Sequence, residues 1–353
     1  MDFGCSTCLE TFTSKCVVST TPCGHVFHTK CIANWLQNEN TCPQCRKACT
    51  SDQIIKTFFS GLNNNIEKER AEKDKIGQEA MDQWLCKNNP KDEDGKTALH
   101  LAAENGSLDF CKNILDKAVD KNPGDLQGWT PLHEAAYNGH VEICRIILNQ
   151  TVDKNPRDNE GSTPLHKAAY NGHVEICKMI LDKTVDKNPG DHKGSTPLHE
   201  AAYHGHVEIC KTILDQAVDK NPKDHEDRTP LHKAAYNGHV EIFKMILDKA
   251  VDKNPKDQEG WTPLHFAAFN GHVEICTMIV DKAVDKNPEN HEGRTPLHVA
   301  AEIGDKVICR MILDLVEDIF PKMDDGKTPL HLAVKNGHDE IQKLIIAYVS
   351  KKL

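Results

Sequence analysis

Apolar and polar positions repeat along most of the chain with a fixed spacing of 33 residues. The repeat is marked by the tetrapeptide Thr-Pro-Leu-His, which begins at Thr130, Thr163, Thr196, Thr229, Thr262, Thr295 and Thr328. The variant Thr-Ala-Leu-His begins at Thr97, which is 33 residues before the first of these. Units of equal length, joined by Val-Asp-Lys-Asn-Pro segments, indicate an array of internal repeats over residues 90–353.

Within one unit, the spacing of the apolar residues predicts two short helices. Thr130 is a suitable N-cap, Pro131 fits the first helical position because its missing N–H costs nothing there, and Gly139 ends the first helix. Asp158 and Gly161 indicate a tight turn between units. The predicted buried side consists of small and aliphatic residues: Leu132, Ala135, Ala136, Val141, Ile143, Cys144, Ile147 and Leu148.

One such unit is too small to bury its own apolar side, so the units are expected to stack, with atypical units at the ends. In the first unit, Ser107-Leu108-Asp109 replaces the His-Val-Glu segment of the inner units. The period and the motif resemble those of the ankyrin repeat. The resemblance implies a mainly α protein, in which residues 90–353 form a helical solenoid of about eight ankyrin repeats.

The cysteines and histidines that recur with the repeat are expected to be structural. Six of the 15 cysteines follow the period, and Phe243 fills the one slot that they leave, so the position is expected to be buried and apolar. These six are Cys111, Cys144, Cys177, Cys210, Cys276 and Cys309. Histidines recur in the tetrapeptide and after the glycine that ends the first helix, which favours hydrogen bonding over catalysis or metal binding.

Residues 1–50 carry a different cysteine pattern, which is typical of metal ligands. Eight ligand-type residues lie in four close pairs: Cys5 and Cys8, Cys23 and His25, His28 and Cys31, and Cys42 and Cys45. Two tetrahedral zinc ions require eight such ligands, and four protein ligands on each ion leave no open position for catalysis. The sequence therefore predicts two structural Zn²⁺ ions, each contributing about 10–16 kcal/mol to the folding of a segment with little core.

This segment resembles a RING finger of the two-histidine type, a small α+β zinc domain. The resemblance implies an interleaved set of ligands that the spacing alone leaves open. It places Cys5, Cys8, His28 and Cys31 on one ion and Cys23, His25, Cys42 and Cys45 on the other.

RING domains of ubiquitin ligases dock the ubiquitin-conjugating enzyme in a shallow apolar groove, and the resemblance assigns residues to that groove. Trp35 and Pro43 match groove positions, and Arg46 matches the catalytic cation that bridges the conjugating enzyme and ubiquitin. Thr7 and Leu9 flank the second ligand, and the family usually has an apolar residue where Thr7 stands. Docking is therefore expected to be weaker or more selective. The competing explanation for Trp35 is core packing.

Residues 51–89 are expected to form a helical linker between the two domains, in which residues 79–85 are a candidate capping helix for the repeat array. Ile54, Phe58, Leu62 and Ile66 are spaced by four residues, which predicts one apolar stripe on a helix. Such a helix either packs on the zinc domain or pairs two copies of the chain into a homodimer. The stripe is short for a coiled coil, which favours packing.

Differences between otherwise similar repeats indicate where a protein partner binds. The resemblance points to the hairpin tips and first helices, where Trp261, Phe266 and Phe269 predict an apolar hot spot. The predicted partner-binding residues are Trp129, Tyr137, Tyr170, Tyr203, Tyr236, Trp261, Phe266 and Phe269. For the tyrosines, packing against the next repeat is an equally good explanation.

Charge and composition exclude several kinds of partner. The formal net charge of −10 over 353 residues opposes a nucleic-acid or anionic-membrane surface, which needs the opposite sign. No apolar run reaches membrane length. We expect a cytoplasmic protein in a reducing compartment, with the nucleus left open.

Together these features predict an E3 ubiquitin-protein ligase. The RING would dock and activate a ubiquitin-loaded conjugating enzyme, and the ankyrin array would recruit the protein substrate. The alternative is a non-catalytic ankyrin scaffold whose RING is only a zinc-stabilised interaction module, and Thr7 is the one feature that favours it.

Overall fold

The computed structural model describes residues 5, 7–8, 17–23, 25–58 and 91–352. They fall into two compact units, whose boundary lies within the first repeat. The N-terminal segment and the repeat array are described in turn.

The N-terminal segment folds around a three-stranded antiparallel sheet with the strand order β2-β1-β3. Its elements are β1 (Val17–Thr20), β2 (Val26–His28), α1 (Thr29–Trp35), the 3₁₀ helix η1 (Ser51–Gln53) and β3 (Ile55–Phe58). In the β1–β2 pair, Ser19 lies opposite Phe27. Because α1 follows β2 directly, the end of the strand and the first turn of the helix lie next to each other.

Strand β3 corrects one prediction from the sequence. The helical stripe expected to begin at Ile54 is wrong for Ile55–Phe58, which pair with β1. A segment rich in β-branched and aromatic residues favours extended backbone when a neighbouring strand supplies hydrogen-bonding partners. The other stripe positions, Leu62 and Ile66, and the remainder of the expected linker from residue 59 to residue 90 lie outside the described residues.

The core of this segment is very small. Phe27 and Ile32 are fully buried together with the ligand-type residues Cys5 and Cys42, and Leu36 packs against them. So few apolar side chains cannot supply the free energy of folding of an independent domain. The segment therefore depends on whatever joins its cysteines and histidines.

From residue 91 onward the chain is built from pairs of short helices. The first helices of the repeats are α3 (Ala98–Glu104), α5 (Pro131–Asn138), α7 (Pro164–Asn171), α9 (Pro197–His204), α11 (Pro230–Asn237), α13 (Pro263–Phe269), α15 (Pro296–Ile303) and α17 (Pro329–Lys335). The second helices are α4 (Leu108–Lys117), α6 (Val141–Gln150), α8 (Val174–Lys183), α10 (Val207–Gln216), α12 (Val240–Lys249), α14 (Val273–Lys282), α16 (Lys306–Leu315) and α18 (Asp339–Lys352).

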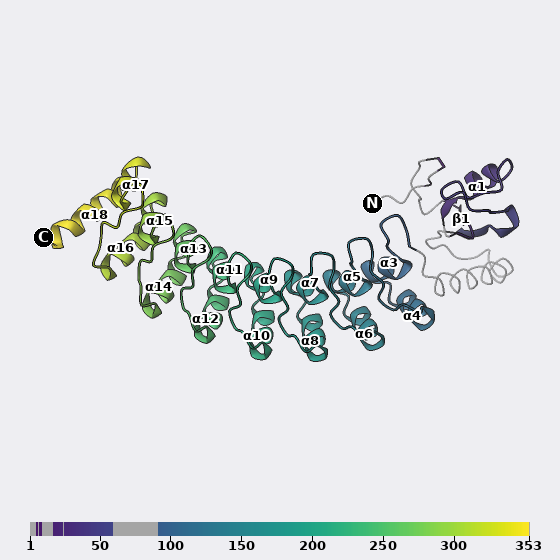
Figure 1. Ribbon diagram of the computed structural model, residues 1–353, viewed down its shortest axis with the longest axis horizontal. Helices are drawn as coiled ribbons and strands as arrows, with labels where there is room; N and C mark the ends of the chain where they lie inside the picture. Colours follow the sequence, from purple (N-terminus) through teal and green to yellow (C-terminus); the bar gives the residue numbers. More distant parts are fainter. Residues whose placement is uncertain (1–4, 6, 9–16, 24, 59–90, 353) are drawn as a thin grey trace, which may run out of the picture. The chain divides into compact units, whose positions relative to one another are not determined.

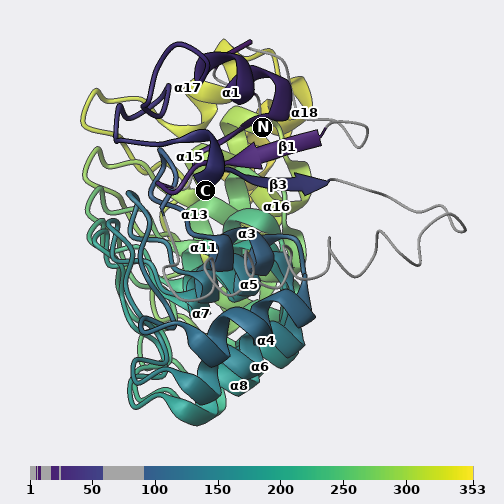
Figure 2. The same ribbon diagram turned by 90° about the vertical axis from the view of Figure 1, so that its right-hand side faces the viewer.

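The helices from α5 to α18 stack in two layers that curve together. Figure 1 shows the first helices, α5 to α17, on the inner side of the curve and the second helices on the outer side. The view along the stack in Figure 2 shows the hairpin loops projecting to one side of both layers. The solenoid predicted from the sequence is confirmed, with its first helices aligned side by side along one surface.

A histidine connects each of the first helices from α5 to α15 to the next repeat. In the repeat that begins at Thr163, the Nδ1 atom of His166 accepts a hydrogen bond from the backbone N–H of Thr163 at 3.1 Å. The ring proton therefore lies on Nε2, which donates to the carbonyl oxygen of Ser195 in the following repeat at 3.0 Å. The structural role expected for these histidines is confirmed.

A second histidine joins the repeats at the far end of the first helices α3, α5, α7, α9, α11 and α15. Gly172 ends α7 in the left-handed conformation, with φ = 81°. The imidazole of His206 lies against Gly172, and its Nε2 atom bonds the carbonyl oxygen of Tyr170 at 2.9 Å. A Cβ atom at position 172 would lie 2.7 Å from Cε1 of His206, so this glycine is required for space as well as for conformation.

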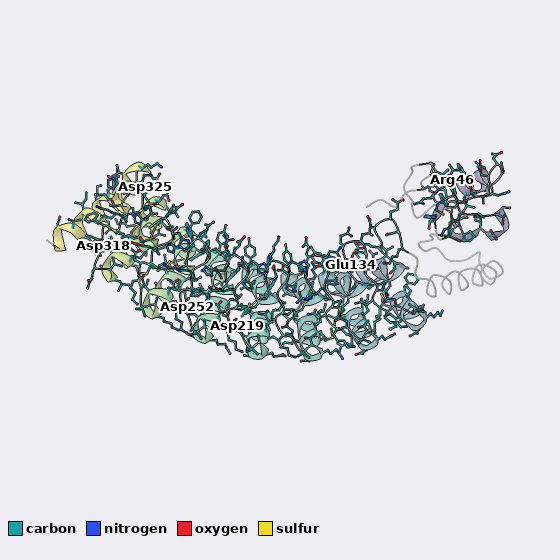
Figure 3. The ribbon with its side chains drawn as sticks, in the orientation of Figure 1. Arg46, Glu134, Asp219, Asp252, Asp318 and Asp325 are labelled. Carbon is teal, nitrogen blue, oxygen red and sulfur yellow. The ribbon has the colours of Figure 1, made fainter. Side chains whose placement is uncertain are left out.

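A second set of hydrogen bonds, from backbone N–H groups to side chains, recurs at the joints between repeats. Asp219 and Asp252 lie on the outer side of the array, just after the second helices (Figure 3), and each accepts a bond from the backbone N–H two residues later. The joint asparagine Asn188 accepts a bond from the N–H of Leu198 at 3.0 Å. The asparagine satisfies an N–H group that the start of α9 leaves open, and the aspartates satisfy N–H groups within the joints, which explains why the joint sequence recurs.

The thiols that follow the repeat period are buried, as expected. All six are fully buried, and so is Phe243 in the slot that they leave. Burial raises the pKa of Cys111 and Cys177 to about 12, so these thiols stay protonated and act as small apolar side chains.

We expect Gly172→Ala to lower the free energy of unfolding more than Gly271→Ala. Both residues end a first helix with positive φ, so both variants lose about 1–2 kcal/mol from the left-handed backbone. Only Gly172 is covered by an imidazole, whereas the nearest atom to a Cβ at Gly271 is a carboxylate oxygen of Asp305, 3.6 Å away. Urea denaturation followed by circular dichroism measures the difference, and adding His206→Ala should recover part of the Gly172→Ala loss. Equal losses in the two single variants would contradict this packing.

The stability of the array is expected to fall as the pH drops below about 6.5. Burial lowers the pKa of His133, His166 and His199 to about 4, and that of His232 and His265 to about 3. Unfolded histidines bind protons near pH 6.5, so between that pH and about 4 the unfolded state binds more protons than the folded state. Each histidine then removes about 1.4 kcal/mol of stability per pH unit. Denaturation curves recorded between pH 7.5 and 4.5 test this, and a stability independent of pH below 6.5 would refute it.

Candidate functional site

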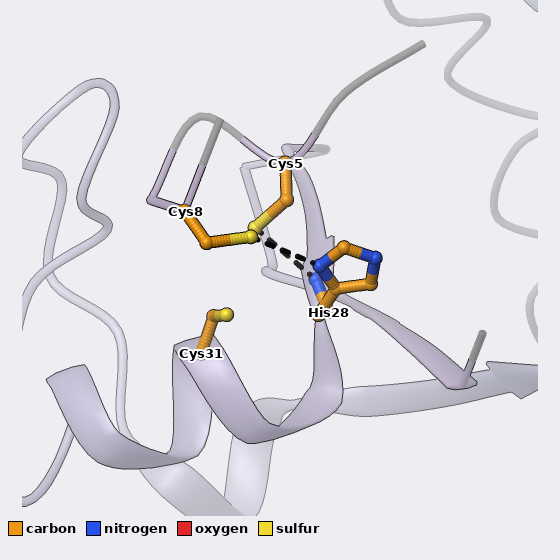
Figure 4. A group of neighbouring side chains, drawn as sticks. All are labelled: Cys5, Cys8, His28 and Cys31. Carbon is orange, nitrogen blue, oxygen red and sulfur yellow. Dashed lines mark hydrogen bonds between the residues drawn. The ribbon is translucent and has the colours of Figure 1, made fainter. Parts of the chain in front are cut away.

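The first group of ligand-type residues gathers where the N-terminal loop meets the end of β2 and the start of α1. It consists of Cys5, Cys8, His28 and Cys31, whose ligand atoms all lie within 4.8 Å of one another (Figure 4). The Sγ atom of Cys8 lies 3.2 Å from Nδ1 of His28. The backbone N–H of His28 points to Sγ of Cys5 at 3.4 Å. Strand and helix together fix these side chains, because His28 ends β2 and Cys31 lies in α1.

The second group is formed by loops on either side of α1. It consists of Cys23, His25, Cys42 and Cys45, again within 4.8 Å of one another. Nδ1 of His25 lies 3.4 Å from Sγ of Cys23 and 3.5 Å from Sγ of Cys42. The Sγ atoms of Cys45 and Cys23 are 3.3 Å apart. These are the two interleaved sets that the RING resemblance implies.

Both groups fit a tetrahedral zinc ion. From the usual zinc–ligand lengths, a tetrahedral site places sulfur and nitrogen about 3.6 Å apart and two sulfurs about 3.8 Å apart. The observed separations of 3.2–3.5 Å and 3.3 Å are close to these values. Each set supplies four protein ligands, so both sites are structural.

The thiols of the two sets need a cation if they are to ionise together. Burial raises the pKa of Cys23 to about 11 and that of Cys31 to about 12. At Cys5, burial also opposes ionisation, but backbone N–H groups of His28, Cys8 and Thr7 outweigh it and lower the pKa to about 7. Zinc binds thiolates, and its double positive charge offsets the repulsion between them.

Beside the second set, Trp35 and Arg46 come into contact. The guanidinium carbon of Arg46 lies 5.2 Å from the centroid of the Trp35 ring, within the range of a cation–π interaction. The indole N–H of Trp35 donates to the carbonyl oxygen of Thr41 at 2.9 Å, which fixes the ring against the loop that carries Pro43. Arg46 remains exposed on this unit (Figure 3), and Pro43 is half-buried.

The backbone of Arg46 is in the left-handed region, with φ = 59°. This conformation is uncommon for a residue with a side chain and costs about 1 kcal/mol. It is held by the bond from the N–H of Arg46 to the carbonyl oxygen of Cys42 at 2.9 Å. The turn that presents the last two ligands therefore also directs Arg46 towards Trp35.

Of the residues flanking the second ligand, the structure describes one. Thr7 is exposed, so its hydroxyl and methyl groups are accessible at the surface of the domain. Leu9 lies outside the described residues.

On the array, the predicted partner-binding residues form two aromatic groups on the first helices and the loops before them. In the first, the ring centroids of Trp129 and Tyr137 are 5.7 Å apart, and those of Tyr137 and Tyr170 are 6.5 Å apart. In the second, Phe266 lies 5.4 Å from Trp261 and 6.0 Å from Tyr236. The tyrosines contact neighbouring aromatic residues and are still about 40% exposed, for example Tyr203 at 42%. Phe269 is 47% exposed. The tyrosines are therefore accessible as well as packed.

Sequence reasoning missed the cations that cover both tryptophans. The ammonium group of Lys167 lies 4.4 Å from the centroid of the Trp129 ring, and the guanidinium carbon of Arg294 lies 5.7 Å from that of Trp261. Each cation belongs to the repeat after its tryptophan. The signal for Lys167 and Arg294 was present, because both occupy the variable slots around the tetrapeptide.

None of the helices in the described part of the chain combines the length and the apolar character that crossing a bilayer requires.

Known proteins resemble the chain in two separate regions. The family model described as ankyrin repeats matches residues 71–158, 150–224, 218–290 and 284–352, and the model described as a Ring finger domain matches residues 3–46. The E3 ubiquitin-protein ligase RNF126-B of Xenopus laevis is 46% identical over 60 residues, which are 17% of this chain and 19% of that protein.

Two human proteins show matches of similar length. The E3 ubiquitin-protein ligase RNF115 is 40% identical over 52 residues, 15% of this chain and 17% of its own length. RING finger protein 122 is 43% identical over 47 residues, 13% of this chain and 30% of its own length. The chain thus spans less than a third of each of these relatives.

The stacked helix pairs, the two four-ligand zinc sites and these matches lead to one assignment. The protein belongs to the ankyrin-repeat family and carries a RING finger homologous to those of E3 ubiquitin ligases at its N-terminal end.

Proposed function

We propose that this protein is a RING-type E3 ubiquitin ligase whose ankyrin array recruits the protein substrate. The observation that carries the proposal is the contact between Arg46 and Trp35 beside a complete zinc site. The exposed guanidinium of Arg46 and the partly exposed ring of Trp35 are both accessible to a partner protein on the surface of this domain.

The reaction requires no nucleophile from this chain. In the transfer step, the amine of a substrate lysine attacks the thioester carbonyl carbon that joins ubiquitin to the cysteine of the conjugating enzyme. The new C–N bond forms, the C–S bond breaks, the cysteine leaves as a thiolate, and the amine gives up a proton. The ligase accelerates this step by holding the thioester in a reactive geometry.

Trp35, Pro43 and Arg46 provide surfaces suited to that task. Trp35 and Pro43 are each partly exposed, so they would offer an apolar contact to the conjugating enzyme. The contact is rigid because Trp35 lies in α1, which carries Cys31 of the first ligand set, and Pro43 lies between Cys42 and Cys45 of the second. The planar guanidinium of Arg46 can donate to carbonyl groups on two partners at once, which a lysine cannot do with the same geometry. We assign docking to Trp35 and Pro43 and activation to Arg46.

Thr7 would make the choice of conjugating enzyme narrower. It is exposed and polar where the family usually offers an apolar side chain, so it removes buried apolar area from the docking surface. Enzymes that contact this position through a polar residue should therefore be the better partners.

The aromatic groups of the array would provide the contact with the substrate. Partly exposed tyrosine, tryptophan and phenylalanine side chains bury large areas at low entropic cost and are enriched at the energetic centres of interfaces. The substrate would be held by Trp129, Tyr137 and Tyr170 or by Tyr236, Trp261 and Phe266 while its lysine reaches the thioester.

We expect Arg46→Ala to lower the discharge of ubiquitin from a loaded conjugating enzyme to free lysine by about tenfold or more, because the bridge between enzyme and ubiquitin is lost. Arg46→Lys keeps the charge but not the fork and should recover only part of the rate. Trp35→Ala should weaken binding of the enzyme itself. Lys47→Ala, at an exposed neighbouring position, is the matched control and should discharge ubiquitin normally.

The assay requires a panel of conjugating enzymes. Discharge unchanged in both Trp35→Ala and Arg46→Ala would refute the residue assignment. An intact, zinc-loaded protein that is inactive with every enzyme would refute the ligase and leave the non-catalytic scaffold.

Purified protein should contain two zinc ions per chain, and Cys23→Ser should lose at least one of them. Elemental analysis measures the content. Cys49→Ser is the control, because Cys49 is a buried cysteine of the same segment that belongs to neither ligand set, and it should retain both ions. Chelation should abolish ubiquitin discharge while most of the helical circular dichroism remains, since the array has its own core. Retained discharge in the zinc-free protein would contradict the zinc-dependent platform.

A further inference from the structure

Charged residues on the first helices follow a pairing rule in two of the repeats. The aspartate of the hairpin turn pairs with a lysine nine positions later, on the first helix of the same repeat. The Nζ atom of Lys167 lies 3.0 Å from a carboxylate oxygen of Asp158, and that of Lys233 lies 3.5 Å from Asp224. Each pair neutralises a carboxylate that is largely withdrawn from solvent.

The repeat between these two breaks the rule. Asp191 and Glu200 occupy the same two positions, so two carboxylates replace a carboxylate and an ammonium group. Among the described residues, no lysine or arginine forms an ion pair with either of them. Glu200 accepts a hydrogen bond from the Ser195 hydroxyl at 3.0 Å. Burial raises the pKa of Glu200, and the charge of Asp191 raises it further, against the opposing effects of the Ser195 hydroxyl and the charges of Lys233 and Lys167. The position thus lacks the cation that both neighbouring repeats supply.

A hollow opens above Glu200. It has a volume of about 250 Å³ and is lined by side chains of the three adjacent helices α7, α9 and α11, among them Tyr170, Tyr203, His204 and Lys233. Its size suits one amino-acid side chain and not a larger organic ligand. Lys233, at its edge, is engaged with Asp224.

Aromatic rings form the wall of this hollow. The ring centroid of His204 lies 4.1 Å from that of Tyr170 and 5.0 Å from that of Tyr203. The equivalent position in the neighbouring repeats is an asparagine, at Asn171 and Asn237, so the third ring is particular to this site. Burial lowers the pKa of His204, which favours the neutral imidazole.

We infer that this hollow binds one lysine or arginine side chain of an extended segment of the recruited protein. The cationic group would take the place of the missing lysine, next to Glu200 and Asp191, while its methylene stem packs against the three rings. The six residues at the two compared positions of these three repeats, Asp158, Lys167, Asp191, Glu200, Asp224 and Lys233, carry a net charge of −2, which a basic segment complements. The inference rests on the proposed recruitment of a protein by the array and adds the chemistry of the contact.

The probe is a peptide selected from a random linear library on the full-length zinc-loaded protein. Selected peptides should share one lysine or arginine at a fixed position. Replacing that residue with norleucine, which keeps the stem and removes the charge, should weaken binding measured by fluorescence anisotropy about tenfold. Glu200→Gln should bind the basic and norleucine peptides with nearly equal affinity. Glu208→Gln, the same substitution on the outer helix of the same repeat, should preserve the tenfold preference.

A second variant separates loss of binding from loss of folding. Glu200→Lys places a lysine opposite Asp191, as in the two neighbouring repeats, and should keep or raise the denaturation midpoint while it abolishes binding of the basic peptide. Three outcomes would overturn the inference: selection of peptides without a basic consensus, failure to select any peptide, or an undiminished preference for the basic peptide in Glu200→Gln.

The same preparations are assayed for ubiquitin discharge to free lysine, which requires no substrate on the array. Glu200→Gln should discharge ubiquitin at the wild-type rate. If the wild-type protein discharges no ubiquitin but still prefers the basic peptide, the ligase proposal is rejected and the basic-residue site is kept. The two proposals can therefore fail separately.

Discussion

A neutral imidazole buried at the start of every first helix from α5 to α15 is the interaction on which the array depends. Its Nδ1 atom can accept the N–H of the capping threonine only while the ring carries a single proton. That proton then lies on Nε2 and reaches a carbonyl oxygen of the next repeat, as His166 does with Ser195. Because one group both begins a helix and fixes its neighbour, the same spacing is reproduced from repeat to repeat. The alignment of the first helices, and of every side chain that they expose, follows from this bond.

The RING segment obeys a different constraint. It has almost no apolar interior, and several of its buried residues are themselves ligands. Two metal ions take over the role that a hydrophobic core has in the array, and they fix the loops that carry Trp35, Pro43 and Arg46. One chain thus contains two solutions to the problem of stabilising short elements. In the array, the stabilising contacts recur from repeat to repeat. In the RING segment, they are concentrated at the two metal ions.

The sequence predicted most of the fold because its signals are local. Thr130, Pro131 and Gly139 mark the ends of a helix within nine residues, and the ligand pairs Cys5–Cys8 and Cys42–Cys45 have spacings that few other structures use. It failed at Ile55–Phe58, where apolar residues spaced by four suggested a helix but pairing with a distant strand decided the conformation. It also missed the contacts of Lys167 with Trp129 and of Arg46 with Trp35. Such contacts depend on how separate elements are placed, and no local pattern contains that information.

Because of Asp305, the bonds between neighbouring repeats are not the same at every junction of the array. In every other repeat after the first, this position holds a histidine that reaches back to the preceding repeat, whereas Asp305 directs its carboxylate to the N–H groups of Val307 and Ile308 in its own helix. In a linear stack, stability is shared only between neighbours, so one bond fewer at a single junction lowers the work needed to part the stack there. Thermal fluctuation or mechanical load would therefore separate the last two repeats from the others at this seam.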